Sequence, residues 1–172
     1  DGLMAGERIL VTGGGTGLGK EMAEGFLKLG AEVHICGRRG QVCEDTAGEL
    51  MDKHGGKVVP HACDIRVAEA ITDMNDHIWA KHGALTGLIN NAAVFQRPAM
   101  SRVPFEQIPV DEWDNLMAVN LRGVFLCCRA VFPQMQKQNK GKIVNISSSA
   151  GKRGSPNTLA YNAGNFALVG MT

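Results

Sequence analysis

The chain has 172 residues, of which 44% are hydrophobic and 20% charged, and its formal net charge is +1 at pH 7. This length suits one globular domain with a sizeable core. The near-neutral charge offers no broad basic surface for nucleic acid or an anionic membrane, so we expect neither as a partner. The longest apolar runs, such as 123–128, fall far below a membrane span of about 20 residues, and the first residues lack a signal-peptide pattern. We therefore expect a cytoplasmic protein.

Short aliphatic or β-branched runs alternate along the chain with longer segments of helical period. The predicted strands are 8–12, 32–36, 57–63, 85–90 and 142–147. Helical spacing follows the first and third of them, at Met22, Phe26 and Leu29 and at Ile71, Met74 and Ile78. The alternation predicts an α/β fold, a doubly wound parallel sheet with right-handed crossovers and helices on both faces.

A long helix is predicted over 111–138, and another begins near Leu159. The long helix carries an apolar stripe of Leu121, Val124, Phe125, Cys128, Phe132 and Met135. Glycines are expected to end helices at positions 30, 55, 56, 83 and 141. The segment 95–109 contains three prolines, and we expect it to be a surface loop bordering the substrate side.

The cysteines and histidines give no sign of a disulfide framework or a metal centre. Five cysteines form an odd set without a CxxC pair, and we interpret them as reduced, buried thiols. The five histidines show no HExxH or similar spacing. No metal site is therefore expected.

A glycine-rich turn, 12–19, joins the first predicted strand to its helix and reads TGGGTGLG. Glycines remove Cβ atoms where a pyrophosphate must approach backbone N–H groups, and the helix amino terminus adds a favourable dipole. A tight connection can also need glycines for steric reasons alone. The position directly after a strand favours nucleotide binding. We therefore predict cofactor-binding roles for Gly13, Gly15, Thr16, Gly17, Leu18 and Gly19.

Arg38 and Arg39 follow the second predicted strand, where an acidic residue would bind the 2'-hydroxyl of NAD. No carboxylate stands there. Two guanidiniums match a 2'-phosphate by charge and by forked geometry, so we predict NADP as the cofactor, with NAD left open. The alternative interpretation is a solvated surface pair.

Further motifs make the chain similar to the short-chain dehydrogenase/reductase family, in the branch that includes 3-oxoacyl-carrier-protein reductases. The resemblance rests on the 12–19 turn, Asp64, Ile65, Asn90 to Ala93, Asn120, Ser148 and Tyr161, thirteen residues after Ser148. It covers the whole chain. It implies a Rossmann fold and an oxidoreductase that transfers hydride between a nicotinamide and a small-molecule ketone or secondary alcohol.

The resemblance also implies the cofactor contacts. Asp64 and Ile65 would contact the adenine, while Asn91, Ala92 and Ala93 would line the adenine and ribose side. A carboxylate can accept a hydrogen bond from the adenine amino group, and small side chains let the cofactor lie against the sheet. Ordinary structural roles are alternatives: a helix cap for Asp64, and turn-forming amides for Asn90 and Asn91.

For catalysis, the resemblance implies that Tyr161 exchanges a proton with the substrate oxygen, that Ser148 hydrogen-bonds the same oxygen, and that Asn120 supports a water-linked proton path. Tyrosine is a poor base at its ordinary pKa of about 10, so such a site needs a nearby cation. The family motif is YxxxK, but Asn165 stands at the lysine position and supplies no charge. Asn165 can still hydrogen-bond ribose hydroxyls.

The resemblance implies more chain after Thr172: a strand, substrate-covering helices and a last strand. We therefore expect residues 1–172 to form a single nucleotide-binding domain, truncated after the helix that carries Tyr161. A catalytically silent nucleotide-binding protein and an incomplete copy of an active reductase are the alternatives to an active enzyme. Family members commonly form dimers or tetramers, so we expect a homodimer or homotetramer with the 121–135 stripe and the tyrosine helix at one interface.

Overall fold

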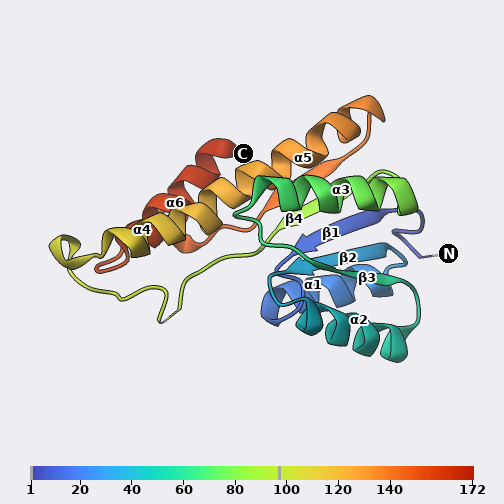
Figure 1. Ribbon diagram of the computed structural model, residues 1–172, viewed down its shortest axis with the longest axis horizontal. Coiled ribbons are helices and arrows are strands. Elements are labelled where there is room, and N and C mark those ends of the chain that lie inside the picture. Colours follow the sequence, from blue (N-terminus) through green and yellow to red (C-terminus); the bar gives the residue numbers. More distant parts are fainter. Residues whose placement is uncertain (1, 97) are drawn as a thin grey trace.

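The computed structural model describes residues 2–96 and 98–172, in which strands and helices alternate (Figure 1). The elements are β1 (Arg8–Thr12), α1 (Gly17–Lys28), β2 (Glu32–Gly37), α2 (Gly40–His54), β3 (Val58–Ala62), α3 (Ala68–His82), β4 (Gly87–Asn90), α4 (Val110–Met117), α5 (Val124–Lys137), β5 (Lys142–Asn145) and α6 (Leu159–Met171). Short 3-10 turns lie at Phe105–Gln107 and Ser149–Gly151.

The five strands form one parallel sheet in the order β3-β2-β1-β4-β5. Helices α1 and α2 cover one face and α3 and α5 the other, which Figure 1 shows below and above the strands. The predicted fold class, a doubly wound parallel sheet with helices on both faces, is therefore confirmed.

Alternation along β1 explains why both faces are covered. Ile9 and Val11 pack in the core under α1 and α2, whereas Leu10 packs in the core under α3 and α5. Successive strand residues point to opposite faces, so a strand buried on both sides is apolar throughout. The run of aliphatic residues in 8–12 is this pattern.

The predicted helix 111–138 consists of two α-helices joined by a π turn at Ala118–Gly123. It ends at Lys137 with Gln138 as its C-cap, before Gly141, and Asn139 takes the left-handed conformation (φ +50°). The prediction for Gly141 was therefore wrong. Asparagine adopts this conformation more readily than most residues with a side chain.

The helical stretch 110–137 is long and apolar enough, by length and composition, to cross a membrane, although its individual apolar runs are short. Many of the apolar side chains in this stretch pack inside the protein. Leu126, Cys127 and Val131 are buried in the core beneath α3, and 44% of the most apolar window is buried. One side of this stretch therefore packs in the core.

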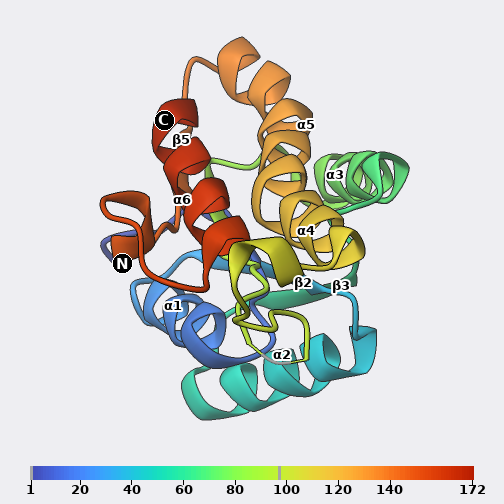
Figure 2. The ribbon, with the colours of Figure 1, turned by 90° about the vertical axis from the view of Figure 1, so that its left-hand side faces the viewer.

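The segment 95–109 was predicted to be a surface loop, and this holds only in part. Residue 97 lies outside the described residues. Met100 is buried and packs with Leu116 of α4 and Ala160 of α6. The loop is thereby tied to α4 and α6, which lie side by side (Figure 2).

The five cysteines are free thiols, as predicted, and all but the half-buried Cys128 are buried. Burial raises the pKa of Cys63 to about 11 and that of Cys127 to about 12. Protonated thiols of this kind are weak nucleophiles, so the cysteines serve packing.

Candidate functional site

A cleft of about 760 Å³ opens at the carboxyl edge of the sheet. The chain runs from β1 outward to β2 and β3 on one side, then returns to β4 and β5 on the other, so the strand order reverses between β1 and β4. Ligands of open α/β sheets bind at such a reversal. All the predicted site residues line this cleft.

The glycine turn forms one wall of the cleft. Gly13 and Gly17 have positive φ values (+65° and +52°), which residues with side chains adopt at a cost. A Cβ atom on Gly14 would lie 2.6 Å from Ile35 Cγ2, and one on Gly19 would collide with the Gly13 carbonyl oxygen. Local packing therefore demands Gly14 and Gly19, which is the steric alternative considered for this turn.

The turn also offers hydrogen-bond donors to an anion. Helix α1 begins at Gly17 directly behind it, and the N-cap residue Thr16 makes no side-chain hydrogen bond to the helix end. The first N–H groups of a helix have no partner within the helix and attract negative charge. Gly15, Thr16 and Gly17 line the cleft, and their N–H groups donate to no residue that the structure describes.

Thr12 joins the turn to the end of β4. Its hydroxyl oxygen, almost fully buried, accepts hydrogen bonds from the N–H groups of Asn91 and Ala92, both at 3.0 Å. The Asn91 amide in turn donates to the Thr12 carbonyl oxygen at 3.1 Å. These bonds hold the Asn91–Ala93 segment against the glycine turn.

A Thr12→Val variant is expected to lower the free energy of unfolding by about 2 to 3 kcal/mol, because two N–H groups lose their acceptor while the side-chain volume is kept. Urea unfolding followed by circular dichroism measures this loss. Thr12→Ser keeps the oxygen and should cost only about 1 kcal/mol for the missing methyl group. Equal losses in the two variants would show that the hydroxyl is unimportant.

Arg38 and Arg39 lie at the end of β2 and line the cleft. Their side chains make no hydrogen bond or ion pair with any residue that the structure describes. They are the only positively charged residues among the described residues of the cleft lining; Lys152 and Arg153 do not line it. Both guanidiniums are thus available to an anion.

Asp64 follows β3, and its carboxylate is already held by Arg66. Arg66 Nε donates to both carboxylate oxygens at 3.0 Å, and its Nη2 lies 2.6 Å from Oδ2. Arg66 also lowers the pKa of this carboxyl group. The suggested helix cap is wrong, because α3 begins at Ala68 with Val67 as its N-cap. Sequence reasoning missed Arg66.

Ser148 and Tyr161 come from different elements, and both line the cleft. Ser148 follows β5, and its hydroxyl accepts a hydrogen bond from the N–H of Ala150 at 3.2 Å. Tyr161 lies in the first turn of α6, with its ring centroid 6.3 Å from that of Phe95. The Tyr161 hydroxyl makes no hydrogen bond within the described part of the chain.

Asn165 lies one helical turn after Tyr161 and is buried. Its amide nitrogen donates to the Tyr161 carbonyl oxygen at 2.9 Å, and its Oδ1 accepts from the Ser147 hydroxyl at 3.1 Å. Sequence reasoning also missed Ser147, although it is next to Ser148. The contact between Ser147 and Asn165 joins positions that are 18 residues apart, so the sequence held no direct signal of it.

Asn120 lies in the π turn, and both ends of its side-chain amide are used. Oδ1 accepts from the Val94 N–H at 2.7 Å, and Nδ2 donates to the Val94 carbonyl oxygen at 2.8 Å. The side chain therefore fixes the backbone that leads from β4 into the 95–109 loop. A hydrogen-bonded amide of this kind positions its partner.

The sheet reversal, the glycine turn and the helix amino terminus together define a nucleotide-binding α/β protein. The chain belongs to the short chain dehydrogenase family, whose model matches residues 7–172. It is 31% identical over 170 residues to the 3-oxoacyl-[acyl-carrier-protein] reductase of Chlamydia muridarum, covering 99% of this chain and 66% of that protein.

Two solved structures support the same assignment. A metagenomic short-chain oxidoreductase in complex with NADP matches with a TM-score of 0.90 at 34% identity, over 98% of this chain and 74% of that one. NAD+-bound xylitol dehydrogenase matches with a TM-score of 0.92 at 28% identity, over 98% and 63%. The chain spans 62% to 66% of the length of the first three curated relatives it matches.

Proposed function

We propose that the chain carries the cofactor-binding and catalytic part of an NAD(P)-dependent oxidoreductase that interconverts a small-molecule ketone and a secondary alcohol. The observation that carries this proposal is that Ser148 and Tyr161 line the same cleft as the glycine turn. We further propose that residues 1–172 act as one nucleotide-binding domain. A cytoplasmic location stays a prediction from composition.

The residues of the cleft fit a dinucleotide. The unpaired N–H groups from Gly15 to Gly17 would hold the pyrophosphate, with Gly13, Leu18 and Gly19 completing the wall. Ile65 and Asp64 would border the adenine, with the carboxylate kept ionised by Arg66. Asn91, Ala92 and Ala93 would line the ribose side.

NADP is the favoured cofactor in this proposal. Arg38 and Arg39 make no hydrogen bond or ion pair with a described residue and stand where the second strand ends. A 2'-phosphate dianion would give both guanidiniums a charged, forked partner. The NADP-bound and NAD-bound structures that resemble the chain are compatible with either cofactor.

In the proposed chemistry, Tyr161 exchanges a proton with the substrate oxygen. A bound nicotinamide supplies or accepts the hydride. In the reducing direction, the Tyr161 hydroxyl gives its proton to the substrate oxygen, while Ser148 donates a hydrogen bond to that oxygen. Asn120 keeps the Val94 backbone in place beside the cleft, and its support of a water-linked proton path stays a prediction. Asn165 positions Ser147 and the start of α6 but adds no charge.

A Tyr161→Phe variant tests this assignment. We expect its turnover to fall only about tenfold, which is less than the usual effect of removing a general acid. The reason is that position 165 carries no cation that would make Tyr161 a more effective proton donor and acceptor. NADPH affinity should stay within about twofold, since the substitution removes only the hydroxyl. Steady-state ketone reduction and fluorescence titration of NADPH measure the two effects. Unchanged turnover with intact cofactor binding would contradict the proposed role.

We also propose self-association through α5 and α6. The predicted stripe divides in the structure: Val124 and Met135 are buried in the core, whereas Phe125 and Phe132 are 49% and 57% exposed. Phe166 on α6 is also 47% exposed. Large exposed aromatic side chains favour an interface. Sedimentation equilibrium should give a dimer or tetramer mass, and a monomer at micromolar concentration would contradict this.

A further inference from the structure

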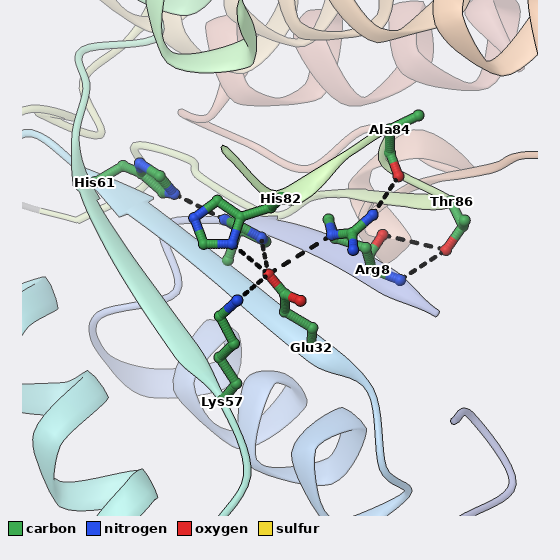
Figure 3. A network of polar contacts seen from close by, with 8 residues as sticks. Arg8, Glu32, Lys57, His61, His82, Ala84 and Thr86 are labelled. Atoms are coloured by element: carbon green, nitrogen blue, oxygen red, sulfur yellow. Dashed lines mark hydrogen bonds and ion pairs between the residues drawn. The ribbon is translucent and has the colours of Figure 1, made fainter. Parts of the chain in front are cut away.

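A cluster of polar side chains surrounds Glu32, at the amino end of β2 (Figure 3). Glu32 is the first residue of β2, His34 follows it on the same face, and His82 is the last residue of α3. His34 is fully buried, and the Glu32 and His82 side chains are 18% and 13% exposed. None of the three lines the cofactor cleft. We call them the Glu32–His34–His82 cluster.

The potential ligand atoms of the cluster converge. Glu32 Oε1 lies 3.1 Å from His34 Nε2 and 2.7 Å from His82 Nδ1, and all three atoms lie within 4.8 Å of one another. A tetrahedral zinc ion, with bonds of about 2.0 to 2.2 Å to nitrogen and oxygen, holds its ligand atoms roughly 3.3 to 3.5 Å apart. Small side-chain adjustments would therefore place all three around one ion.

His82 shows that hydrogen bonding does not fully account for this arrangement. Its Nδ1 is buried and lies 2.7 Å from Glu32 Oε1, an ion-pair contact, but it makes no hydrogen bond within the described part of the chain. Buried ring nitrogens normally have a partner. A metal ion bound by both atoms would provide one, once they had moved apart to about 3.3 Å.

His61 of β3 gives His34 the support that metal-binding histidines usually have. His34 Nδ1 and His61 Nε2 are 2.9 Å apart, and the two rings are stacked. When Nδ1 of His34 carries the proton and donates to His61, Nε2 presents its lone pair to the cluster. Such an outer hydrogen bond fixes both the tautomer and the orientation of a ligand.

Two cations now approach the carboxylate. Lys57 Nζ lies 3.2 Å and Arg8 Nε 3.6 Å from Glu32 Oε1 (Figure 3). Arg8 is held elsewhere by a 3.0 Å hydrogen bond from Nη1 to the Ala84 carbonyl oxygen. The Lys57 side chain is 53% exposed and can swing into solvent. An entering ion would thus compete chiefly with Lys57.

We propose that Glu32, His34 and His82 bind one zinc-type divalent ion, with water as the fourth ligand. Two imidazoles and one carboxylate suit zinc better than Mg²⁺ or Ca²⁺, which prefer all-oxygen sites. The ion links the start of β2 to the end of α3, far from the cofactor cleft. Its effect is to stabilise the fold.

The test is calorimetric titration of Zn²⁺ into the tag-free chain after dialysis against a chelator. One ion should bind per chain, Mg²⁺ should not compete, and bound Zn²⁺ should raise the melting temperature. Glu32→Gln and His82→Ala should each weaken binding by about tenfold or more. His54→Ala, which removes a histidine that pairs with Glu24 away from the cluster, is the matched control and should leave Zn²⁺ binding unchanged.

Lys57 provides a second test, because a cluster with a purely structural role would not bind Zn²⁺ more tightly when Lys57 is replaced. Lys57→Gln should tighten Zn²⁺ binding by about two- to fivefold, because the competing charge is gone. Lys20→Gln removes a lysine that pairs with Glu49 elsewhere and should leave the affinity unchanged.

Two results would overturn the proposal: no Zn²⁺ uptake by the unmodified chain, or uptake that Glu32→Gln and His82→Ala leave intact. If these variants fail to fold, the visible absorption spectrum of Co²⁺ bound to the unmodified chain tests the proposal instead. The strong visible absorption of a four-coordinate site supports the proposal, and a spectrum like that of aqueous Co²⁺ overturns it.

Discussion

An Asn165→Lys variant is expected to reduce a ketone with NADPH about 100-fold faster than the natural chain. Positions 161 and 165 share one face of α6, so an ammonium at 165 would lie close to Tyr161 and to the cofactor ribose. A neighbouring positive charge favours tyrosinate by about 1 to 3 pKa units. General acid–base catalysis of this kind contributes about 10² to 10⁴ in rate.

The substitution has a structural cost that must be measured beside the rate. Lysine cannot accept the hydrogen bond that Ser147 donates to Asn165 Oδ1, and its loss costs about 1 kcal/mol. Thermal unfolding shows whether the variant stays folded at the assay temperature.

A neutral side chain of similar length is the matched control for Asn165→Lys. Asn165→Met loses the same hydrogen bond but adds no charge, so its rate should stay near that of the natural chain. Adding Tyr161→Phe to Asn165→Lys should remove the gain, because the lysine acts through the tyrosine. A folded lysine variant that binds NADPH but gains no activity would show that position 165 is not what limits turnover.

An Arg38→Ser variant is expected to bind NADPH about 10- to 100-fold more weakly. A forked hydrogen bond to a charged phosphate contributes about 1.5 to 3 kcal/mol. NADH affinity should change by less than about twofold, since NADH has a hydroxyl group in place of the 2'-phosphate. Parallel fluorescence titrations with NADPH and NADH measure the selectivity directly.

Two further variants separate phosphate recognition from general electrostatics. Arg38→Lys keeps the charge but loses the forked geometry, so it should retain part of the NADPH preference. Arg129→Ser removes an exposed arginine on α5, away from the cleft, and should leave both affinities unchanged. Equal losses for NADPH and NADH in Arg38→Ser would contradict a role in phosphate recognition.

The sheet could be predicted because its signals are local. The aliphatic run of β1 matches the observed strand from Arg8 to Thr12, since burial on both faces leaves its mark on every residue. Strand ends were less clear: β4 begins at Gly87, two residues after the predicted start. Edges of strands depend on pairing with neighbours, which the sequence does not display.

The residues of the cleft could be named in advance, but their partners could not. Ser148 and Tyr161 follow from the family pattern, and the fold brings both to the cleft. The Arg66 clasp on Asp64 and the Asn120 bonds to Val94 depend on side-chain conformations that no spacing encodes. The roles in catalysis and cofactor binding stay predictions.

The histidines show the same limit more clearly. His34 and His82 are separated by 48 positions and belong to no metal-binding motif, so sequence spacing predicted no metal site. Parallel pairing of β1, β2 and β3, together with the return of α3, places the two rings around one carboxylate. The cluster therefore depends on contacts between elements that are far apart in the sequence.

The central claim is that the cleft at the carboxyl edge of the sheet holds a nicotinamide dinucleotide. Its most direct test is equilibrium titration of the unmodified chain with NADPH, followed by the fluorescence of the reduced nicotinamide. We expect saturable binding at one site per chain, displaced by NADP and tighter than the binding of NADH. A titration with no saturable binding of NADPH or NADH to the folded chain would contradict the claim.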